Sequence, residues 1–229
     1  MSRRIVVAID GPAGAGKSTV ARRVADALGF VYIDSGAMYR AVALWALRRG
    51  VSDSDMHRLE QLAREADIAF RPGAATVLLN GEDVTEAIRL PEISAVASRV
   101  AAVSAVRRAL VDKQRLMAAE NSVVMEGRDI GTVVFPEAKV KIFLDAEPVV
   151  RTGRRVEELR GRGTPVNSET AARDIAERDC RDSTRPESPL MQAPDAMYLD
   201  SSRLSVDEVV EQVLRTVRER TANGKEVAR

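Results

Sequence analysis

The sequence predicts an α/β protein with a parallel sheet flanked by helices, a small antiparallel-sheet insert and a helical lid. Short apolar runs alternate with helical patterns from residue 6 onward, which is typical of strand–helix–strand units. Closely spaced strand candidates within residues 67–88 interrupt this alternation. Residues 151–185 then carry nine arginines and no lysine, and a glycine-rich break divides them into two helical segments.

A glycine-rich segment connects the first strand to the first helix. It reads Gly11-Pro12-Ala13-Gly14-Ala15-Gly16-Lys17-Ser18-Thr19. The apolar run 6–9 precedes it, and Val20, Val24 and Leu28 follow at helical spacing. Strand, turn and helix in this order distinguish a phosphate-binding loop from a structural glycine turn with a stray lysine. We therefore expect a P-loop NTPase fold that binds a nucleoside triphosphate. Backbone N–H groups and Lys17 would hold its phosphates, and the Ser18 hydroxyl would bind Mg²⁺.

Composition excludes several classes of function. A length of 229 residues fits one domain, and a net charge of +1 gives no electrostatic reason to expect nucleic acid or a membrane as partner. Cys180 is the only cysteine, which rules out an internal disulfide and suits the cytoplasm. His57 is the only histidine, so we do not expect catalysis to depend on an imidazole.

The second strand and helix add polar residues at the loop's edge of the sheet. Strand 30–33 follows Gly29, an expected helix C-cap, and Asp34 opens a helix that runs to about Arg49. Carboxyl ends of parallel strands meet at one edge, where ligands bind. Asp34, Ser35 and Arg40 should therefore lie near the phosphate-binding loop. The alternative for Arg40 is an ordinary solvated arginine.

The middle of the chain changes character. After a helix over 55–66, short strands are expected at 68–70, 76–79 and 83–84, with separators at Arg71-Pro72-Gly73 and Asn80-Gly81. An Asn-Gly pair between apolar runs is a strong hairpin signal, so we expect a small antiparallel lobe over residues 67–88. Residues 93–120 are helix-rich, with a break near Ser104. Their arginines, 99, 107, 108 and 115, are most simply solvated, although Ser98 and Arg107 could instead face a ligand.

A further strand over 122–125 leads into Glu126-Gly127-Arg128-Asp129-Ile130-Gly131-Thr132. Arg128 and Asp129 either bind ligand at this edge or form a structural pair with each other; the edge position favours ligand binding. Strand 140–145 follows, with a helix that begins near Pro148.

The arginine-rich segment 151–185 is broken by Gly161-Arg162-Gly163-Thr164-Pro165. Such charges usually form a solvated face, but in a chain that binds a triphosphate they indicate a lid. A helix through residues 178–185 would place Arg178, Arg181, Asp182 and Arg185 on one face. The last strand, 196–200, and a helix capped by Ser205 complete the domain, and residues 223–229 are expected to form a frayed tail.

Four of these segments together resemble the bacterial cytidylate kinase family. They are residues 10–19, 34–40, 126–136 and 178–185, and the similarity extends from Ile5 to about Val217. The resemblance implies a nucleoside monophosphate kinase that uses ATP and Mg²⁺ to phosphorylate CMP or dCMP, and it suggests a monomer. It also implies a core of residues 1–50, 121–150 and 190–222, a monophosphate-binding region of 51–120 and a lid of 151–189.

The resemblance also assigns roles to residues. Lys17, Arg128 and Arg185 are expected to be catalytic. Ser35, Arg40, Arg128 and Arg185 would bind the acceptor phosphate, Ser98, Arg107 and Asp129 the cytosine, and Arg178 and Asp182 the sugar side. A kinase for shikimate, UMP or AMP is the main alternative. A GTPase-like switch would need an Asn-Lys-x-Asp segment and an ABC-type ATPase a Leu-Ser-Gly-Gly segment, and the sequence has neither.

Overall fold

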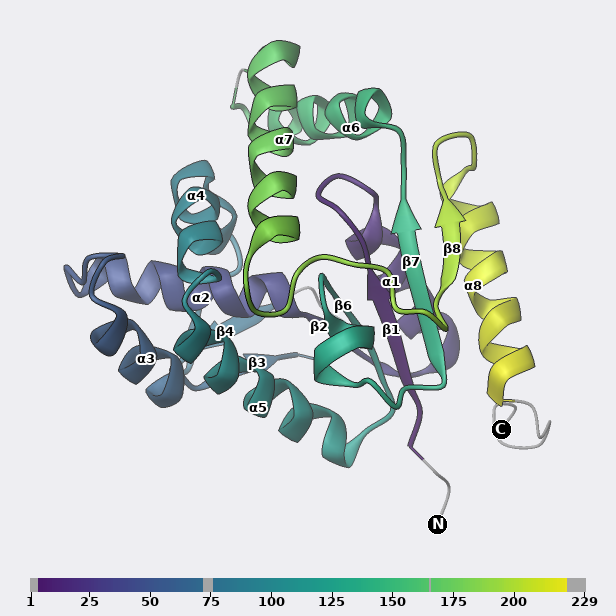
Figure 1. Cartoon of the computed structure of the whole chain (residues 1–229), viewed down its shortest axis with the longest axis horizontal. Helices are drawn as coiled ribbons and strands as arrows, with labels where there is room; N and C mark the ends of the chain where they lie inside the picture. The colour runs from purple at the N-terminus through teal and green to yellow at the C-terminus, as the bar shows by residue number, and fades with distance from the viewer. Residues whose placement is uncertain (1–3, 72–75, 165, 222–229) are drawn as a thin grey trace.

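The computed structural model describes residues 4–71, 76–164 and 166–221. Its centre is a five-stranded sheet in the order β2-β6-β1-β7-β8, with every neighbouring pair parallel (Figure 1). The strands are β1 (Val6–Asp10), β2 (Val31–Asp34), β6 (Val123–Gly127), β7 (Val140–Asp145) and β8 (Met197–Asp200). The predicted parallel α/β fold is confirmed, and each central strand lies within two residues of its predicted position.

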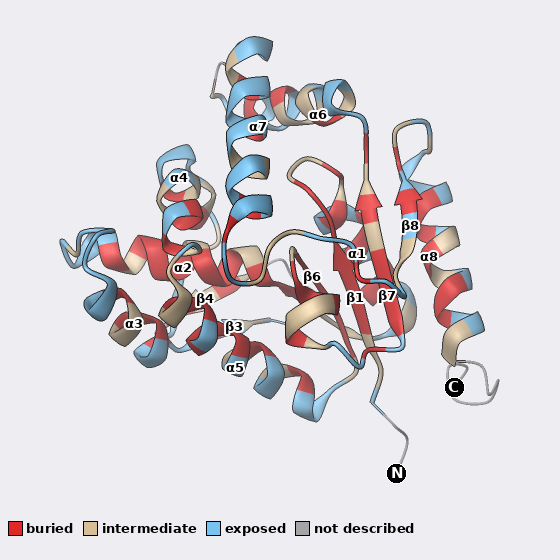
Figure 2. Ribbon diagram, in the orientation of Figure 1, coloured by how far each residue is buried: buried red, intermediate tan, exposed pale blue. Residues whose placement is uncertain are grey.

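Two apolar cores form, one on each face of the sheet (Figure 2). Side chains alternate along a strand, so Val7 and Ile9 of β1 enter one core while Ala8 enters the other. The core that contains Val7 and Ile9 is completed by α1 (Lys17–Leu28) and α8 (Val206–Thr221). The core that contains Ala8 is completed by the helices between β2 and β6. Because both faces are covered, the strands consist of nearly continuous apolar runs.

Helix ends follow the local signals in the sequence. Gly29 ends α1 in the left-handed conformation, with φ of 65°, as expected for a C-cap. Ser205 and Glu208 form a reciprocal capping box at the start of α8, because each side chain accepts the other's backbone N–H. Pro148 occupies the first turn of α6 (Pro148–Gly161), where the missing N–H is harmless.

The middle segment forms a lobe beside the main sheet (Figure 1). It contains α2 (Ser35–Arg48), α3 (Met56–Glu65), β3 (Ile68–Phe70), β4 (Val77–Leu79), β5 (Glu82–Asp83), a 3₁₀ turn (Ala87–Arg89), α4 (Pro91–Val100) and α5 (Ser104–Glu120). The three short strands are antiparallel, which confirms the small sheet. Asn80 and Gly81 both have positive φ, 51° and 83°, as a two-residue hairpin turn requires. The predicted Pro72-Gly73 separator lies outside the described residues.

Helices α6 and α7 (Ser168–Thr184) lie above the carboxyl ends of the strands and pack against each other (Figure 1). The break between them is confirmed, and Gly163 adopts a φ of 71° there; Pro165 and residues 223–229 lie outside the described residues. One prediction was wrong. The four charged residues expected on one helical face do not share it, namely Arg178, Arg181, Asp182 and Arg185. Arg185 follows the end of α7 in an extended conformation, and Arg181 is exposed. No described helix combines the length and apolarity that a membrane crossing needs.

Candidate active site

The glycine-rich segment forms a tight loop between β1 and α1. Gly14 and Gly16 have φ of 77° and 93°, which other residues rarely adopt. A Cβ on Gly11 would lie 1.9 Å from the carbonyl oxygen of Leu144 on β7, so only glycine fits there. No side chain caps the start of α1 at Gly16, which leaves backbone N–H groups available for an anion. The predicted loop therefore has the backbone geometry that phosphate binding requires.

Lys17 begins α1 and folds back over the loop. Its Nζ donates to the carbonyl oxygen of Pro12 at 2.6 Å, and its side chain is buried. Burial and, after it, the nearby Arg128 lower the pKa of Lys17 to about 7, although Glu126 acts in the opposite direction. Burial has removed the Lys17 ammonium from water, so a bound phosphate would stabilise its positive charge strongly.

This lowered pKa predicts proton uptake when nucleotide binds. Above this pKa the neutral form of Lys17 is favoured in the ligand-free protein, and phosphate oxygens favour the charged form, so binding at pH 8 should take up protons. Calorimetric titration with a non-hydrolysable ATP analogue, in buffers of different ionisation enthalpy, measures this uptake. Lys17→Ala should abolish it, and an unchanged uptake in that variant would assign the proton to another group.

Acidic residues lie at or next to the carboxyl ends of all five strands of the main sheet. Asp10 ends β1 and accepts the backbone N–H groups of Ile130 and Gly131 at 2.8 and 2.7 Å. These bonds hold a π-helical turn (Ile130–Val134) that directly follows Arg128 and Asp129. Burial raises the pKa of Asp10 to about 6 against the effect of these bonds. Asp10 thereby connects β1, which leads into the glycine-rich loop, to the segment that carries Arg128 and Asp129.

Asp34 and Arg40 form a pair at the end of β2. Asp34 caps α2 by accepting the N–H of Ala37 at 2.8 Å, and its other oxygen accepts from Arg40 at 2.7 Å. Burial acts to raise the pKa of Asp34, but Arg40 and the capping bond outweigh it and the pKa is lowered. Arg40 is therefore not a freely solvated arginine: it is held at the carboxyl edge of the sheet, where it was expected, and its contact with a ligand stays a prediction.

Glu126 is a residue that the sequence interpretation did not place among the site residues. It is the last but one residue of β6, pairs with Asp34 of β2, is buried, and accepts from the Tyr32 hydroxyl at 2.6 Å. Burial and the Asp34 charge raise the pKa of Glu126, while Lys17 and a hydrogen bond from Ser18 lower it less. Its position at a strand end, the signal that identified Asp34, could have identified Glu126 too.

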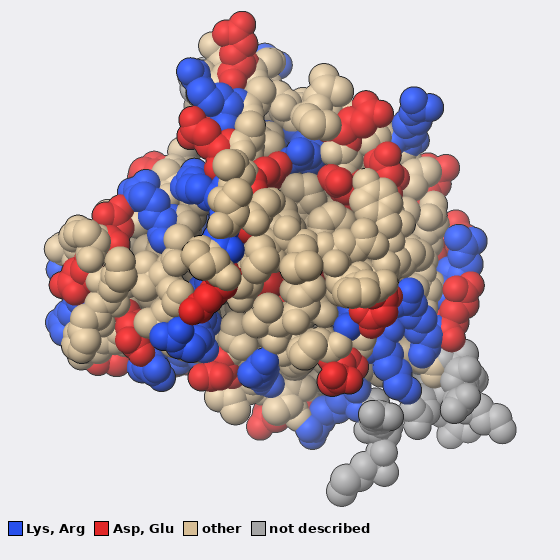
Figure 3. All heavy atoms as spheres, viewed as in Figure 1, with Lys and Arg blue, Asp and Glu red and all other residues tan. Residues whose placement is uncertain are grey.

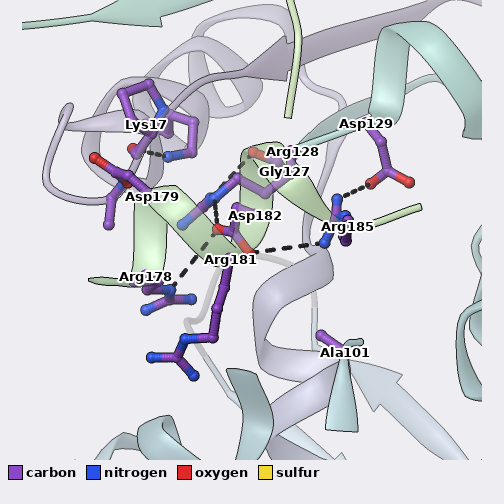
Figure 4. Close-up of polar contacts among 12 residues, drawn as sticks. Lys17, Ala101, Gly127, Arg128, Asp129, Arg178, Asp179, Arg181, Asp182 and Arg185 are labelled. Carbon is purple, nitrogen blue, oxygen red and sulfur yellow. Dashed lines mark hydrogen bonds and ion pairs between the residues drawn. The ribbon is translucent and has the colours of Figure 1, made fainter. Parts of the chain in front are cut away.

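Asp182 of α7 draws together arginines from both sides of the site (Figure 4). Arg128 donates to it at 2.9 Å, and Arg178 and Arg185 lie 4.0 and 3.7 Å from its oxygens. Burial acts to raise the pKa of Asp182, but these three arginines outweigh it and lower the pKa. Burial and Arg128 lower the pKa of Arg178 to about 10, so Asp182 only partly compensates the gathered positive charge.

Asp129 forms the second half of the same network. It accepts from Arg107, which is only 3% exposed and also lies over the Tyr39 ring, and its other oxygen is 4.0 Å from Arg185. Arg128 and Asp129 therefore do not pair with each other, and each faces a different partner. The simplest interpretation of Arg107, as a solvated charge, was wrong, because this side chain is buried. The alternative, that Arg107 faces a ligand, stays a prediction.

Several polar atoms in this network have no partner. Among the described residues, six buried side-chain polar atoms make no hydrogen bond, and four of them belong to predicted acceptor residues. These four are Arg40 Nε, Ser98 Oγ, Arg107 Nε and Arg185 Nη2. Leaving buried polar groups unpaired costs about 1–3 kcal/mol each. Arg107 and Arg185 both lie at Asp129, so at least two of these atoms belong to one cluster, where a ligand could supply the partners.

The fold thus brings most of the predicted site residues together at the carboxyl edge of the sheet, whereas Ser98 is buried on α4 and its hydroxyl makes no hydrogen bond with them in the described structure. Ser35 begins α2 and donates to the Glu126 carbonyl oxygen at 2.6 Å. Ser18 and Thr19 of the glycine-rich segment are exposed. Five arginines, numbers 40, 107, 128, 178 and 185, face the three carboxylates of Asp34, Asp129 and Asp182. On the face shown in Figure 3, blue Lys and Arg atoms gather where α7 meets the lobe that carries α4.

The chain is similar to one family over nearly its whole length. The family model described as cytidylate kinase matches residues 7–219. A cytidylate kinase from Solibacter usitatus is 60% identical over 226 residues, covering 98% of this chain and 97% of that protein. One from Pelotomaculum thermopropionicum is 52% identical over 214 residues, covering 92% and 95%. A solved structure of an uncharacterised protein from Eubacterium ventriosum, 15% identical and covering 95% of this chain and all of that one, has a TM-score of 0.54 and shows likeness of fold alone.

Proposed function

This chain belongs to the cytidylate kinase family and is a nucleoside monophosphate kinase, and we propose that it transfers the γ-phosphoryl group of ATP to CMP or dCMP at the carboxyl edge of its sheet. The products are CDP or dCDP and ADP. One observation carries the assignment of the site: arginines surround Asp129 and Asp182, next to buried polar atoms that have no partner among the described residues. Such a site suits an anionic ligand with several hydrogen-bonding groups.

The cytosine base fits the end of the site formed by Asp129, Arg107 and Ser98. The Asp129 carboxylate accepts from the exocyclic amino group, while Arg107 Nε and the Ser98 hydroxyl, both unpaired, donate to the ring nitrogen and carbonyl. Uracil presents a carbonyl where cytosine presents its amino group. A buried mismatch of this kind costs about 1–3 kcal/mol and therefore disfavours UMP.

The acceptor phosphate fits between the base end and the phosphate-binding loop. Arg40 and Arg185 each retain an unpaired nitrogen there, and Arg128 lies close enough to Lys17 to lower its pKa. Ser35 contributes a hydroxyl at the same edge. Arginine suits this role because its planar fork binds two phosphate oxygens and keeps its charge.

The donor triphosphate fits the glycine-rich loop, and its Mg²⁺ fits the oxygen groups beside it. The Ser18 hydroxyl lies at the Glu126 carboxylate, and hard oxygen donors of this kind suit Mg²⁺, which usually keeps several waters. A cation there would also offset the buried charge of Glu126. When bound, Mg²⁺ neutralises negative charge on the β- and γ-phosphates.

Transfer at this site needs alignment and charge neutralisation rather than an acid–base group. An oxygen of the acceptor phosphate attacks the γ-phosphorus in line, and the bond to the β-phosphate oxygen breaks. Lys17, Arg128 and Arg185 stabilise the charge on the transferring group. Arg178 and Asp182, which lie on α7, face the sugar of the acceptor nucleotide. Closure of α6 and α7 therefore completes the site and excludes water from it.

Arg185→Lys tests the assignment of this site. It keeps the charge but loses the fork, so turnover should fall by about 10²-fold, as for the loss of one donor to a transition-state oxygen. Arg181→Lys is the matched control, because Arg181 is exposed on α7, and it should leave turnover unchanged. ADP release is measured with CMP, dCMP, UMP, AMP and shikimate as acceptors. A fully active Arg185→Lys enzyme would remove this residue from the site, and a preference for UMP, AMP or shikimate would refute the acceptor assignment.

The same proposal makes residues 151–189 a lid that closes on nucleotides. Hydrogen exchange across α6 and α7 should slow when CMP and a non-hydrolysable ATP analogue bind together, because the phosphates offset the repulsion among arginines. Equal protection with and without ligands would contradict closure.

We also propose that the enzyme acts as a monomer in the cytoplasm. Cys180, the only cysteine, is an exposed free thiol, which suits a reducing compartment.

A further inference from the structure

We propose that Asp179 and Arg151 are positioning residues that fasten the two lid helices to the phosphate-binding loop and so fix the placement of Arg178 and Asp182. The inference rests on the proposed lid and deepens it. Asp179 lies on α7 and accepts the backbone N–H of Ala13, in the loop, at 3.3 Å. Its other oxygen accepts from Arg151 of α6, so one carboxylate contacts all three elements.

Arg151 completes this junction. Its guanidinium also donates to the carbonyl oxygen of Ala13 at 3.1 Å and to that of Ala146 at 3.0 Å. The backbone of α6 lies directly against the loop as well, because a Cβ on Gly14 would be 3.0 Å from the Arg151 carbonyl oxygen. The two polar groups of Ala13 are therefore both bound by the lid, one by Asp179 and one by Arg151.

The position of Asp179 in α7 connects this junction to the reacting groups. Arg178 precedes it, and Asp182 lies about one helical turn further along with its partner Arg128 (Figure 4). Fixing Asp179 on the loop therefore fixes both the rotation of α7 and its height above the loop. A displacement of about 1 Å in a positioned group lowers turnover by up to about 10²-fold.

The opposite charges of Asp179 and Arg151 predict opposite effects of their removal on the affinity for ATP. Asp179 places a negative charge beside a loop that binds a triphosphate, and Arg151 neutralises it. Without Arg151 the carboxylate would repel ATP, whereas without the Asp179 charge the guanidinium would attract it. The two residues should therefore have opposite effects on the affinity for ATP while both lower turnover.

The test compares Asp179→Asn, Arg151→Gln and the double variant in the full-length enzyme, by steady-state ADP release with Mg·ATP and CMP. Asp179→Asn keeps an acceptor for Ala13 but loses the charge. It should lower kcat about tenfold, as expected for partial misplacement, without raising the KM for ATP. Arg151→Gln should lower kcat similarly and raise the KM for ATP. The double variant should be no slower than the slower single variant, because the two residues act as a unit.

Two controls separate positioning from a general loss of structure. Asp174→Asn removes an exposed carboxylate from the same helix and should leave kcat and KM unchanged. Arg151→Lys keeps the charge and loses the fork, so it should lower kcat while leaving the KM for ATP near that of the unaltered enzyme. Thermal unfolding confirms that each variant is folded before kinetics are compared.

The outcomes distinguish this inference from the proposed function. An unaltered enzyme that does not phosphorylate CMP would refute the function. If that enzyme is active, an unchanged kcat in Asp179→Asn would refute the positioning role. So would equal shifts of the KM for ATP in both single variants, or a double variant whose loss is the product of the two single losses.

Discussion

Lys17→Ala is expected to lower kcat for phosphoryl transfer by about 10³-fold, the upper range for removing one group that stabilises transition-state charge. The only hydrogen bond of the Lys17 ammonium in the described structure is to the Pro12 carbonyl oxygen, at 2.6 Å. Its burial and lowered pKa show that the free enzyme holds this charge at a cost. We therefore expect the nucleotide phosphates, rather than the protein, to be the partner of the ammonium. ADP release with saturating CMP and ATP measures the loss.

The fold should survive this substitution. Because burial disfavours the charged form of Lys17, removing the ammonium should leave the free energy of unfolding unchanged or slightly higher. Lys139→Ala is the matched control, since Lys139 is exposed just before the amino end of β7, at the opposite edge of the sheet, and it should retain full activity. A folded Lys17→Ala enzyme with normal turnover would show that the loop does not bind the transferred phosphate.

Asp129→Asn is expected to lower kcat/KM for CMP by about 10²-fold while changing the KM for ATP little. The side chain keeps its shape, but the cytosine amino group loses its charged acceptor, and buried Arg107 loses the negative charge that it faces. Removing one charge from a buried pair typically costs about 2–5 kcal/mol, which corresponds to about 30-fold or more. Steady-state kinetics with CMP, UMP and ATP varied in turn measure the effect.

The same experiment decides between two roles for Asp129. An aspartate after a strand beside a phosphate loop often orders Mg²⁺. Here Asp129 contacts Arg107 and Arg185, whereas Glu126 lies at Ser18. If the concentration of Mg²⁺ needed for half-maximal rate rose as steeply as the KM for CMP, Asp129 would belong to the metal side. Asp112→Asn, at a residue on α5 outside the site, is the control and should change neither.

Local patterns in the sequence determined the elements and the donor loop. Apolar periodicity placed every central strand, the Asn80–Gly81 pair placed the hairpin, and the strand–loop–helix order identified the phosphate-binding loop. These features are predictable because each depends on residues close together in the chain. A turn needs particular φ angles, and a helix face needs a fixed spacing. The edge of the sheet on which the site residues meet followed from parallel topology.

Only the tertiary structure decided which charges face one another. Arg128 and Asp129 are adjacent in sequence, yet Arg128 binds Asp182, 54 residues away, and Asp129 binds Arg107. Asp179 reaches Ala13 across 166 residues. Helical spacing grouped Arg181 with Arg178, but α7 leaves Arg181 exposed and ends before Arg185. Contacts between distant segments depend on how whole elements pack, because burial and the satisfaction of polar groups are properties of the folded chain and are not encoded in spacing along one helix.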